Sequence, residues 1–308
     1  MISALFVVLS LIALSTGIAY SFYLDLIVPI IISLMYLKCD FKYTILSCIT
    51  SLIIIVFVIG DVGSGIWMSQ SMIVGLICGA IIQRKTLIVD DLLYSAIASC
   101  FVMLLINLYF SKLLGFDFIK DIQVMIEPWN INETLKNVLY YICIAALPLG
   151  TTILVYFATL LIGKKLKLLS EDGKKKFKAS INFIKCSGYF CCSEKATIIS
   201  IIYLVSLKIL SLFNYSVKHI YLKTLLVSIQ CIVLYFVIKD FYSFICKFIY
   251  IKTKSNIIVR LSSLVILFLL IYKFQITAIV IIVVGFIIDH IFKMRKSHIN
   301  VMEQYLSS

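Results

Sequence analysis

The segment from Lys164 to Lys195, KKLKLLSEDGKKKFKASINFIKCSGYFCCSEK, separates two long blocks of almost uninterrupted apolar sequence. It holds nine lysines against three acidic residues. Short loops of membrane proteins that are rich in lysine and arginine lie on the cytoplasmic side. The segment therefore predicts a membrane protein with a cytoplasmic central loop and two halves of unequal size.

The composition supports a membrane location. The chain has 62% hydrophobic and 14% charged residues, and its mean hydropathy is +1.10. A soluble domain carries about 25% charged residues, so these charges are too few to cover a water-facing surface. The apolar runs are long enough for helices that cross a hydrocarbon core of about 30 Å, and they lack the alternation of barrel strands. We expect an all-α, polytopic helical membrane protein with about 8–10 transmembrane helices.

The apolar runs predict ten spans. They cover residues 2–20, 24–38, 43–60, 66–83, 91–114, 135–162, 196–213, 221–238, 257–272 and 275–292. The joint at 272–275 leaves open a single bent or re-entrant element, so the expectation is eight to ten spans. No basic residue precedes the first run, so we expect a retained helix and not a cleaved signal peptide.

The orientation follows from five basic clusters, each of which comes after an even-numbered span. They are Lys38 with Lys42, Arg84 with Lys85, the segment 164–195, Lys239 to Lys254, and Lys293 to Lys296. One orientation places all five clusters in the cytoplasm, together with both termini. The expected domains are a six-helix membrane domain (1–163), a basic cytoplasmic loop (164–195), a C-terminal membrane domain of three to four spans (196–296) and a cytoplasmic tail (297–308).

The lysines of the central loop alternate with apolar side chains, as in an amphipathic element that lies on the inner leaflet. We expect them to face anionic lipid or a cytoplasmic partner; the set is Lys164, Lys165, Lys167, Lys174, Lys175, Lys176 and Lys178. The formal charge of +13 then reflects contact with lipid headgroups. No nucleic-acid partner is expected.

Ionisable groups inside a membrane are costly and need a reason. Lys208 lies well within its span, where it either contacts a solute or extends to the headgroups. On the opposite side of the membrane, Asp61 and Trp67 follow a glycine-rich turn that either holds an anion or is an ordinary turn. Glu127 and Trp129 form either a lid or an aromatic anchor. Asp289 is expected to pair with Lys293, four residues later, or with Arg260.

Small residues allow close helix contact in lipid. Ala13, Gly17 and Ala19 line one region of the first span, and Gly75 and Gly79 form a GxxxG motif in the fourth. We expect these residues to pack against helices of this chain or of a partner. Pro29 and Pro148 are expected to bend their spans and to border cavities.

The sequence contains no P-loop, HExxH, GxSxG or paired catalytic carboxylates. The ten cysteines have no zinc spacing and are expected to be free thiols, and three histidines are too few for a histidine-rich metal site. We therefore expect no enzymatic activity, no metal and no cofactor.

Three short stretches carry a family resemblance: Gly75-Leu76-Ile77-Cys78-Gly79, Leu147-Pro148, and the ending from Gly285 to Lys296. With them the chain resembles the YybS-like membrane proteins of low-GC Gram-positive bacteria, although Cys191-Cys192-Ser193 stands where that family tends to have proline. The resemblance implies a multi-pass protein of the cytoplasmic membrane.

Residues 1–163 also resemble the S components of energy-coupling factor transporters, which have six helices and cytoplasmic termini. This resemblance implies a solute site near the outer ends of the helices, with Asp61, Trp67, Glu127 and Trp129 as candidates. It also implies a coupling subunit against Ala13, Gly17 and Ala19, and an ATPase on another chain. The alternative is a membrane scaffold or regulator of cell-envelope processes without transport activity.

Overall fold

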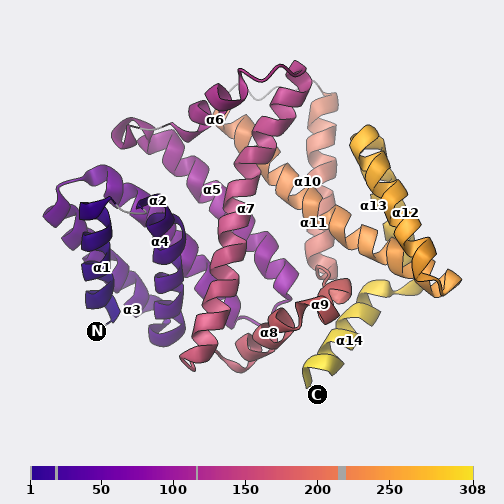
Figure 1. The fold of residues 1–308 in the computed structure, drawn as a ribbon, viewed down its shortest axis with the longest axis horizontal. Helices are drawn as coiled ribbons and strands as arrows, with labels where there is room; N and C mark the ends of the chain where they lie inside the picture. Colours follow the sequence, from indigo (N-terminus) through magenta and orange to yellow (C-terminus); the bar gives the residue numbers. More distant parts are fainter. Residues whose placement is uncertain (1, 18–19, 116, 214–219, 308) are drawn as a thin grey trace. The chain divides into compact units, whose positions relative to one another are not determined.

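The structure, a computed structural model, describes residues 2–17, 20–115, 117–213 and 220–307. These residues form helices joined by short loops, without a strand (Figure 1). The chain divides into two compact units. The first comprises Met1–Ser180 and Ser216–Ile232, and the second comprises Ile181–Tyr215 and Val233–Ser308.

The expected boundaries at 163 and 196 differ from this division. Residues 164–180 of the basic segment, which include nearly all of helix α8, fold with the first unit, and the beginning of the long helix α11 also belongs to that unit. The expected tail begins within helix α14 and carries the buried His298.

The first unit contains the N-terminal helices. Their bounds are α1 Ile2–Thr16, α2 Tyr20–Phe22, the π-helix η1 Tyr23–Ile27, α3 Val28–Ile59, α4 Val62–Gln83, α5 Ile88–Leu114, α6 Phe118–Ile126, α7 Glu133–Lys165 and α8 Glu171–Ile181. Helix α11, Ile220–Thr253, contributes its first residues.

Helix α3 contains a reversal of the chain at Asp40, whose φ of 63° and ψ of 174° are not helical. A Cβ on Gly75 would meet Pro29, and one on Gly79 would meet Tyr36, so α4 runs parallel to the part of α3 before Asp40. A Cβ on Gly65 would instead meet Val56 across the turn at Gly60, so α4 runs antiparallel to the part after Asp40. The predicted spans 24–38 and 43–60 are therefore two arms of a helical hairpin.

The second unit contains α9 Phe183–Cys186, the 3-10 turn η2 Ser187–Tyr189, α10 Glu194–Leu212, the remainder of α11, α12 Asn256–Tyr272, α13 Phe274–Phe292 and α14 Met294–Ser307. Phe241 and Phe244 of α11 are fully buried in it. A Cβ on Gly285 would lie 2.4 Å from the Phe241 side chain, so α13 packs closely on α11. Helices α12 and α13 are separate elements joined at Lys273, and they lie side by side in Figure 1.

Each of the ten predicted spans overlaps a helical segment of the described residues. Among the described residues, six helical stretches are long and apolar enough to cross a membrane: Tyr20–Ile59, Val62–Gln83, Ile88–Ser111, Glu133–Lys165, Ile220–Thr253 and Phe274–Phe292. The first includes the hairpin at Asp40, and each of its arms, at 1.5 Å per residue, has about the length of a hydrocarbon core. The protein is an all-α, polytopic membrane protein, as predicted.

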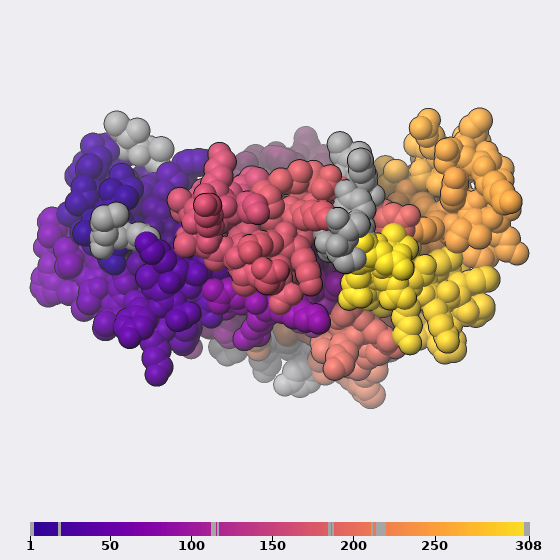
Figure 2. Space-filling view, turned by 90° about the horizontal axis from the view of Figure 1, so that it is seen from below, coloured from indigo at the N-terminus to yellow at the C-terminus, as the bar shows by residue number. Residues whose placement is uncertain are grey.

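Three basic clusters lie at one end of the first unit. Lys38 precedes the reversal at Asp40, and Arg84 follows the parallel helix α4. A Cβ on Gly163 would lie 3.3 Å from Leu37, which places the end of α7 there too. Figure 2 views the chain from this end, and the rose-coloured part that contains α8 lies on the visible surface. The helix pairing thus gathers these clusters on one side.

Candidate functional site

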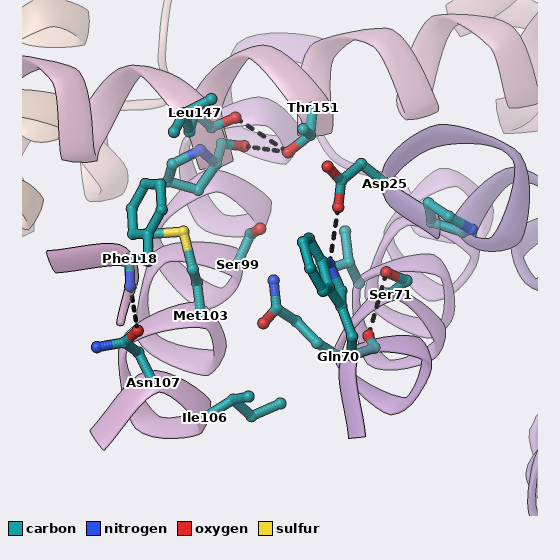
Figure 3. Close-up of a pocket in the computed structure, with 14 residues that line it drawn as sticks. Asp25, Gln70, Ser71, Ser99, Met103, Ile106, Asn107, Phe118, Leu147 and Thr151 are labelled. Carbon is teal, nitrogen blue, oxygen red and sulfur yellow. Dashed lines mark hydrogen bonds between the residues drawn. The ribbon is translucent and has the colours of Figure 1, made fainter. Parts of the chain in front are cut away.

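A cavity of about 120 Å³ lies among the helices of the first unit. Its walls come from η1, α3, α4, α5, α7 and the first residue of α6 (Figure 3). The polar lining residues are Asp25, Gln70, Ser71, Ser99, Asn107 and Thr151; the others are Pro29, Trp67, Val74, Met103, Ile106, Phe118, Leu147 and Pro148. A mostly apolar cavity with a few convergent polar groups is the usual form of a small-molecule site.

Asp25 is held in the wall by local backbone geometry and by Trp67. Proline has no N–H, so Pro29 cannot donate to the Asp25 carbonyl as an α-helix requires. The backbone instead forms the π-helix η1, and the N–H of Val28 donates to the Tyr23 carbonyl. The Trp67 indole Nε1–H donates to Asp25 Oδ1 at 3.1 Å (Figure 3). Single π-turns in helices frequently occur at functional sites.

Trp67 is oriented in turn by Tyr20. The two rings meet edge to face with centroids 5.9 Å apart, and the Tyr20 hydroxyl is 2.9 Å from Ser64 Oγ. The indole therefore has a defined position, which orients the Asp25 carboxylate as well.

A polar network closes the end of the cavity near α6. Asn107 donates through Nδ2 to Asp117 Oδ1 at 3.0 Å, and its Oδ1 accepts from the Phe118 amide at 2.9 Å. The Tyr221 hydroxyl donates to Asp117 Oδ2 at 3.3 Å. Burial raises the pKa of Asp117, but hydrogen bonds from Asn107 and Lys120 outweigh it and hold the pKa below the usual value. Asn107 thus fixes the start of α6 on α5.

On α7, Thr151 is part of the wall and lies one turn after Pro148. Its hydroxyl donates to the carbonyls of Leu147 at 3.1 Å and Pro148 at 3.2 Å. Both prolines that were expected to border cavities, Pro29 and Pro148, line this one.

Of the outer residues expected to bind a solute, Trp67 lines the cavity and the others do not. Asp61 caps α4 by accepting from the amides of Gly63 and Ser64 at 2.9 and 3.0 Å. The hydrogen bond from the Ser64 hydroxyl lowers the pKa of Asp61 and outweighs partial burial, which raises it. Glu127 and Trp129 lie on an exposed turn after α6. Asp61, Glu127 and Trp129 therefore lie outside this cavity, and a solute contact at these three residues stays a prediction.

Lys208 does not lie in the cavity either. It is an exposed residue of α10 in the second unit. Whether its side chain extends to the headgroups or contacts a solute elsewhere stays a prediction.

Sequence reasoning missed Asp25, Gln70, Ser99 and Asn107. The signal for Asp25 was available, since a carboxylate lies inside a predicted apolar span four residues before a proline. Gln70, Ser99 and Asn107 have no comparable signal, because uncharged polar residues are common in membrane helices and their common cavity depends on tertiary packing.

The expected lipid-facing or partner-facing lysines divide into two groups. Lys164, Lys165, Lys167, Lys174 and Lys175 are exposed, and Lys178 is half-buried. Lys176 contradicts the expectation, because its side chain is buried and ion-paired with Asp91. An amphipathic segment can bury its apolar face in protein as well as in lipid, and α8 uses that face and Lys176 to pack on α4 and α5.

The small residues also divide. Gly75 and Gly79 pack against α3 within this chain, and Ala13 packs against the core cluster of the first unit. Gly17 is exposed in a left-handed conformation after the end of α1, with open space where a Cβ would lie. Ala19 lies outside the described residues.

Asp289 pairs with Arg295 and not, as expected, with Lys293 or Arg260. Arg295 Nε lies 3.0 Å from Asp289 Oδ2. Lys293 has a left-handed conformation that ends α13, so the helical spacing of four residues does not bring it to Asp289. Arg295 also donates to Thr197 Oγ1 at 2.6 Å and lies 3.5 Å from Asp240 Oδ2, so it connects α14, α13, α11 and α10.

One comparison with known proteins gives a match. Residues 4–139 match a family model described as predicted membrane protein (DUF2232). The matched region extends from α1 into the start of α7 and includes Asp25, Trp67, Gln70, Ser99 and Asn107. No curated protein and no solved structure matches the chain. The match agrees with a multi-pass membrane protein.

Proposed function

We propose that the first unit is the solute-binding membrane component of a transporter that a partner protein energises. The observation that carries this proposal is the cavity, which places seven side chains with polar atoms between apolar helices: Asp25, Trp67, Gln70, Ser71, Ser99, Asn107 and Thr151. Polar groups at this depth are costly unless they serve one another or a ligand. The six-helix likeness to S components supports the same function.

The solute enters from the side opposite the basic clusters. Asp25 and Trp67 lie about one and a half turns into their helices from that end, and α6 lies there as well. With the basic clusters in the cytoplasm, the cavity opens toward the outside of the cytoplasmic membrane. The energising ATPase then acts at the basic end, where the exposed lysines of α8 and anionic lipids are available for contact.

The test is purification of the full chain from its native membrane in mild detergent, followed by mass spectrometry of bound small molecules and partner proteins. Ser99→Leu places a larger side chain in the cavity, and Ser206→Leu on exposed α10 is the matched control. We expect the wild type and Ser206→Leu to carry a solute and an ATPase partner, and Ser99→Leu to retain the partner but lose the solute. A wild-type protein with neither would contradict the proposal and favour the scaffold or regulator.

A further inference from the structure

We propose that the solute is a small organic cation and that the Asp25 carboxylate is its charge partner. This inference rests on the proposed function and names the class of solute. Among the fourteen described residues that line the cavity, Asp25 alone is charged. The sign of the charge at the site is therefore set by this one side chain.

Among the described residues, the Asp25 carboxylate forms no ion pair with a basic side chain. Its hydrogen bond comes from Trp67, whose indole is neutral. Asp91 and Asp117, by contrast, have lysine partners in the same unit. A carboxylate at membrane depth is stabilised by a nearby positive charge, and a bound cation supplies that charge.

Trp67 adds a second attraction for a cation. The N–H edge of the indole donates to Asp25 at 3.1 Å, and the ring itself lines the cavity, so a solute in the cavity contacts the indole as well as the carboxylate. The π face of tryptophan attracts ammonium groups, and quaternary ammonium ligands are commonly bound in this way. An anionic solute would be repelled by Asp25 and would meet no compensating lysine or arginine in the described wall.

The dimensions of the cavity restrict the solute. Its volume of about 120 Å³ is smaller than the roughly 150 Å³ of an engineered cavity that binds benzene. The part of the solute that enters the cavity is therefore about the size of benzene or smaller. Gln70, Ser99 and Thr151 offer an amide and two hydroxyls, which match a hydroxyl on the solute. A small ammonium compound with one hydroxyl has the required size, charge and polarity.

The chain contains a reporter for this site, because one of its two tryptophans is Trp67. The other, Trp129, lies on the exposed turn, so in Trp129→Phe the tryptophan emission comes from Trp67. The detergent-purified full chain with this change is titrated with choline and with its uncharged isostere 3,3-dimethylbutan-1-ol. We expect a saturable change of Trp67 emission with choline, and binding of the alcohol weaker by about tenfold or more.

Asp25→Asn removes the charge and retains an oxygen that accepts from Trp67. We expect it to weaken choline binding by about tenfold or more, whereas Asp61→Asn, on the capping residue outside the cavity, has no effect. Asp25→Glu retains the charge and serves as the second variant; it is expected to bind choline more tightly than Asp25→Asn. The thermal midpoint of each variant verifies that it is folded.

Any one of three results would contradict the proposal that the solute is a cation. The first is that the alcohol binds as tightly as choline, and the second is that Asp25→Asn binds choline as tightly as the wild type does. The third is that Trp67 emission changes with none of choline, methylammonium, ethylammonium and tetramethylammonium. A neutral or acidic solute recovered by mass spectrometry would also refute it and would leave the proposed solute-binding function standing. Recovery of neither solute nor ATPase would refute both.

Discussion

Lys176 and Asp91 form a buried ion pair, with Lys176 Nζ 2.8 Å from Asp91 Oδ2 and side-chain exposures of 5% and 1%. The ammonium also donates to the carbonyls of Ile81 and Arg84 at 3.0 and 2.7 Å. The Tyr156 hydroxyl donates to Asp91 Oδ2 at 2.6 Å. Because both charges have further hydrogen-bond partners, the pair connects α8 to α4, α5 and α7.

Removal of one member of this pair is expected to destabilise the first unit. Lys176→Met leaves the Asp91 carboxylate buried without its cation, and breaking a buried pair in this way costs about 3–5 kcal/mol. The measurement is the thermal midpoint of the detergent-purified protein. Lys174→Met is the matched control, because Lys174 pairs with exposed Glu171 on the same helix and such pairs contribute about 0–1 kcal/mol. Equal effects of the two changes would show that the buried pair does not hold α8.

The positions of the helices could be predicted because hydrophobic length is a local property of the sequence. The expected run 66–83 lies within α4, Val62–Gln83, and Lys38 and Lys42 marked the reversal at Asp40. The partners of charged residues could not be predicted. Asp289 was assigned to Lys293 by helical spacing, but the helix ends at Lys293 and the chain turns Arg295 back toward Asp289.

The candidate site was predicted only in part, for the same reason. Trp67 could be recognised as an outer aromatic residue. Its hydrogen bond to Asp25 depends on the parallel packing of α4 on α3, which brings residues 42 positions apart into contact. Lys176 likewise resembles the lysines beside it, and its burial becomes visible when α8 is placed on α4 and α5.

Gly75 is expected to tolerate no side chain. A Cβ at this position would lie 2.5 Å from the Pro29 carbonyl oxygen, which is backbone and cannot move aside without shifting η1 and α3. We expect Gly75→Ala to lower the thermal midpoint, by an amount equivalent to about 1–3 kcal/mol for overpacking. Gly150→Ala is the control, because nothing lies within 4 Å of its Cβ and alanine favours a helix over glycine by about 0.5–1 kcal/mol. A Gly75→Ala protein as stable as Gly150→Ala would contradict the close packing.

The orientation can be tested by cysteine labelling, but not at the native Cys186, which is 3% exposed. Lys174→Cys places a thiol at the basic end, and Met125→Cys places one on the exposed face of α6. In intact cells we expect a membrane-impermeant maleimide to label Met125→Cys above the background of the unsubstituted chain. We expect the same reagent to label Lys174→Cys only after the cells are lysed. Labelling of Lys174→Cys before lysis would reverse the orientation, because the positive-inside rule assigns this end to the cytoplasm.

His298 is expected to make the second unit sensitive to acid. Its side chain is fully buried between the rings of Tyr189 and Phe244, with centroids 5.4 and 5.2 Å away, and neither ring nitrogen has a hydrogen-bond partner among the described residues. Burial, together with the positive charges of Lys247, Arg295 and Lys239, outweighs the attraction of Asp289 and lowers the pKa of His298 from 6.5 to about 4.

Between these two pKa values the unfolded chain binds a proton at His298 and the folded chain does not. Stability is therefore lost as the pH falls from about 6.5 to about 4, and the loss amounts to about 3 kcal/mol at about 1.4 kcal/mol per pKa unit. His298→Phe retains an aromatic ring between Tyr189 and Phe244 and has no proton to bind. We expect its thermal midpoint to fall less than that of the wild type between pH 7 and pH 4.5, whereas His290→Phe, at an exposed position on α13, retains the full decrease. An equal decrease in His298→Phe and the wild type would assign the acid sensitivity to other groups.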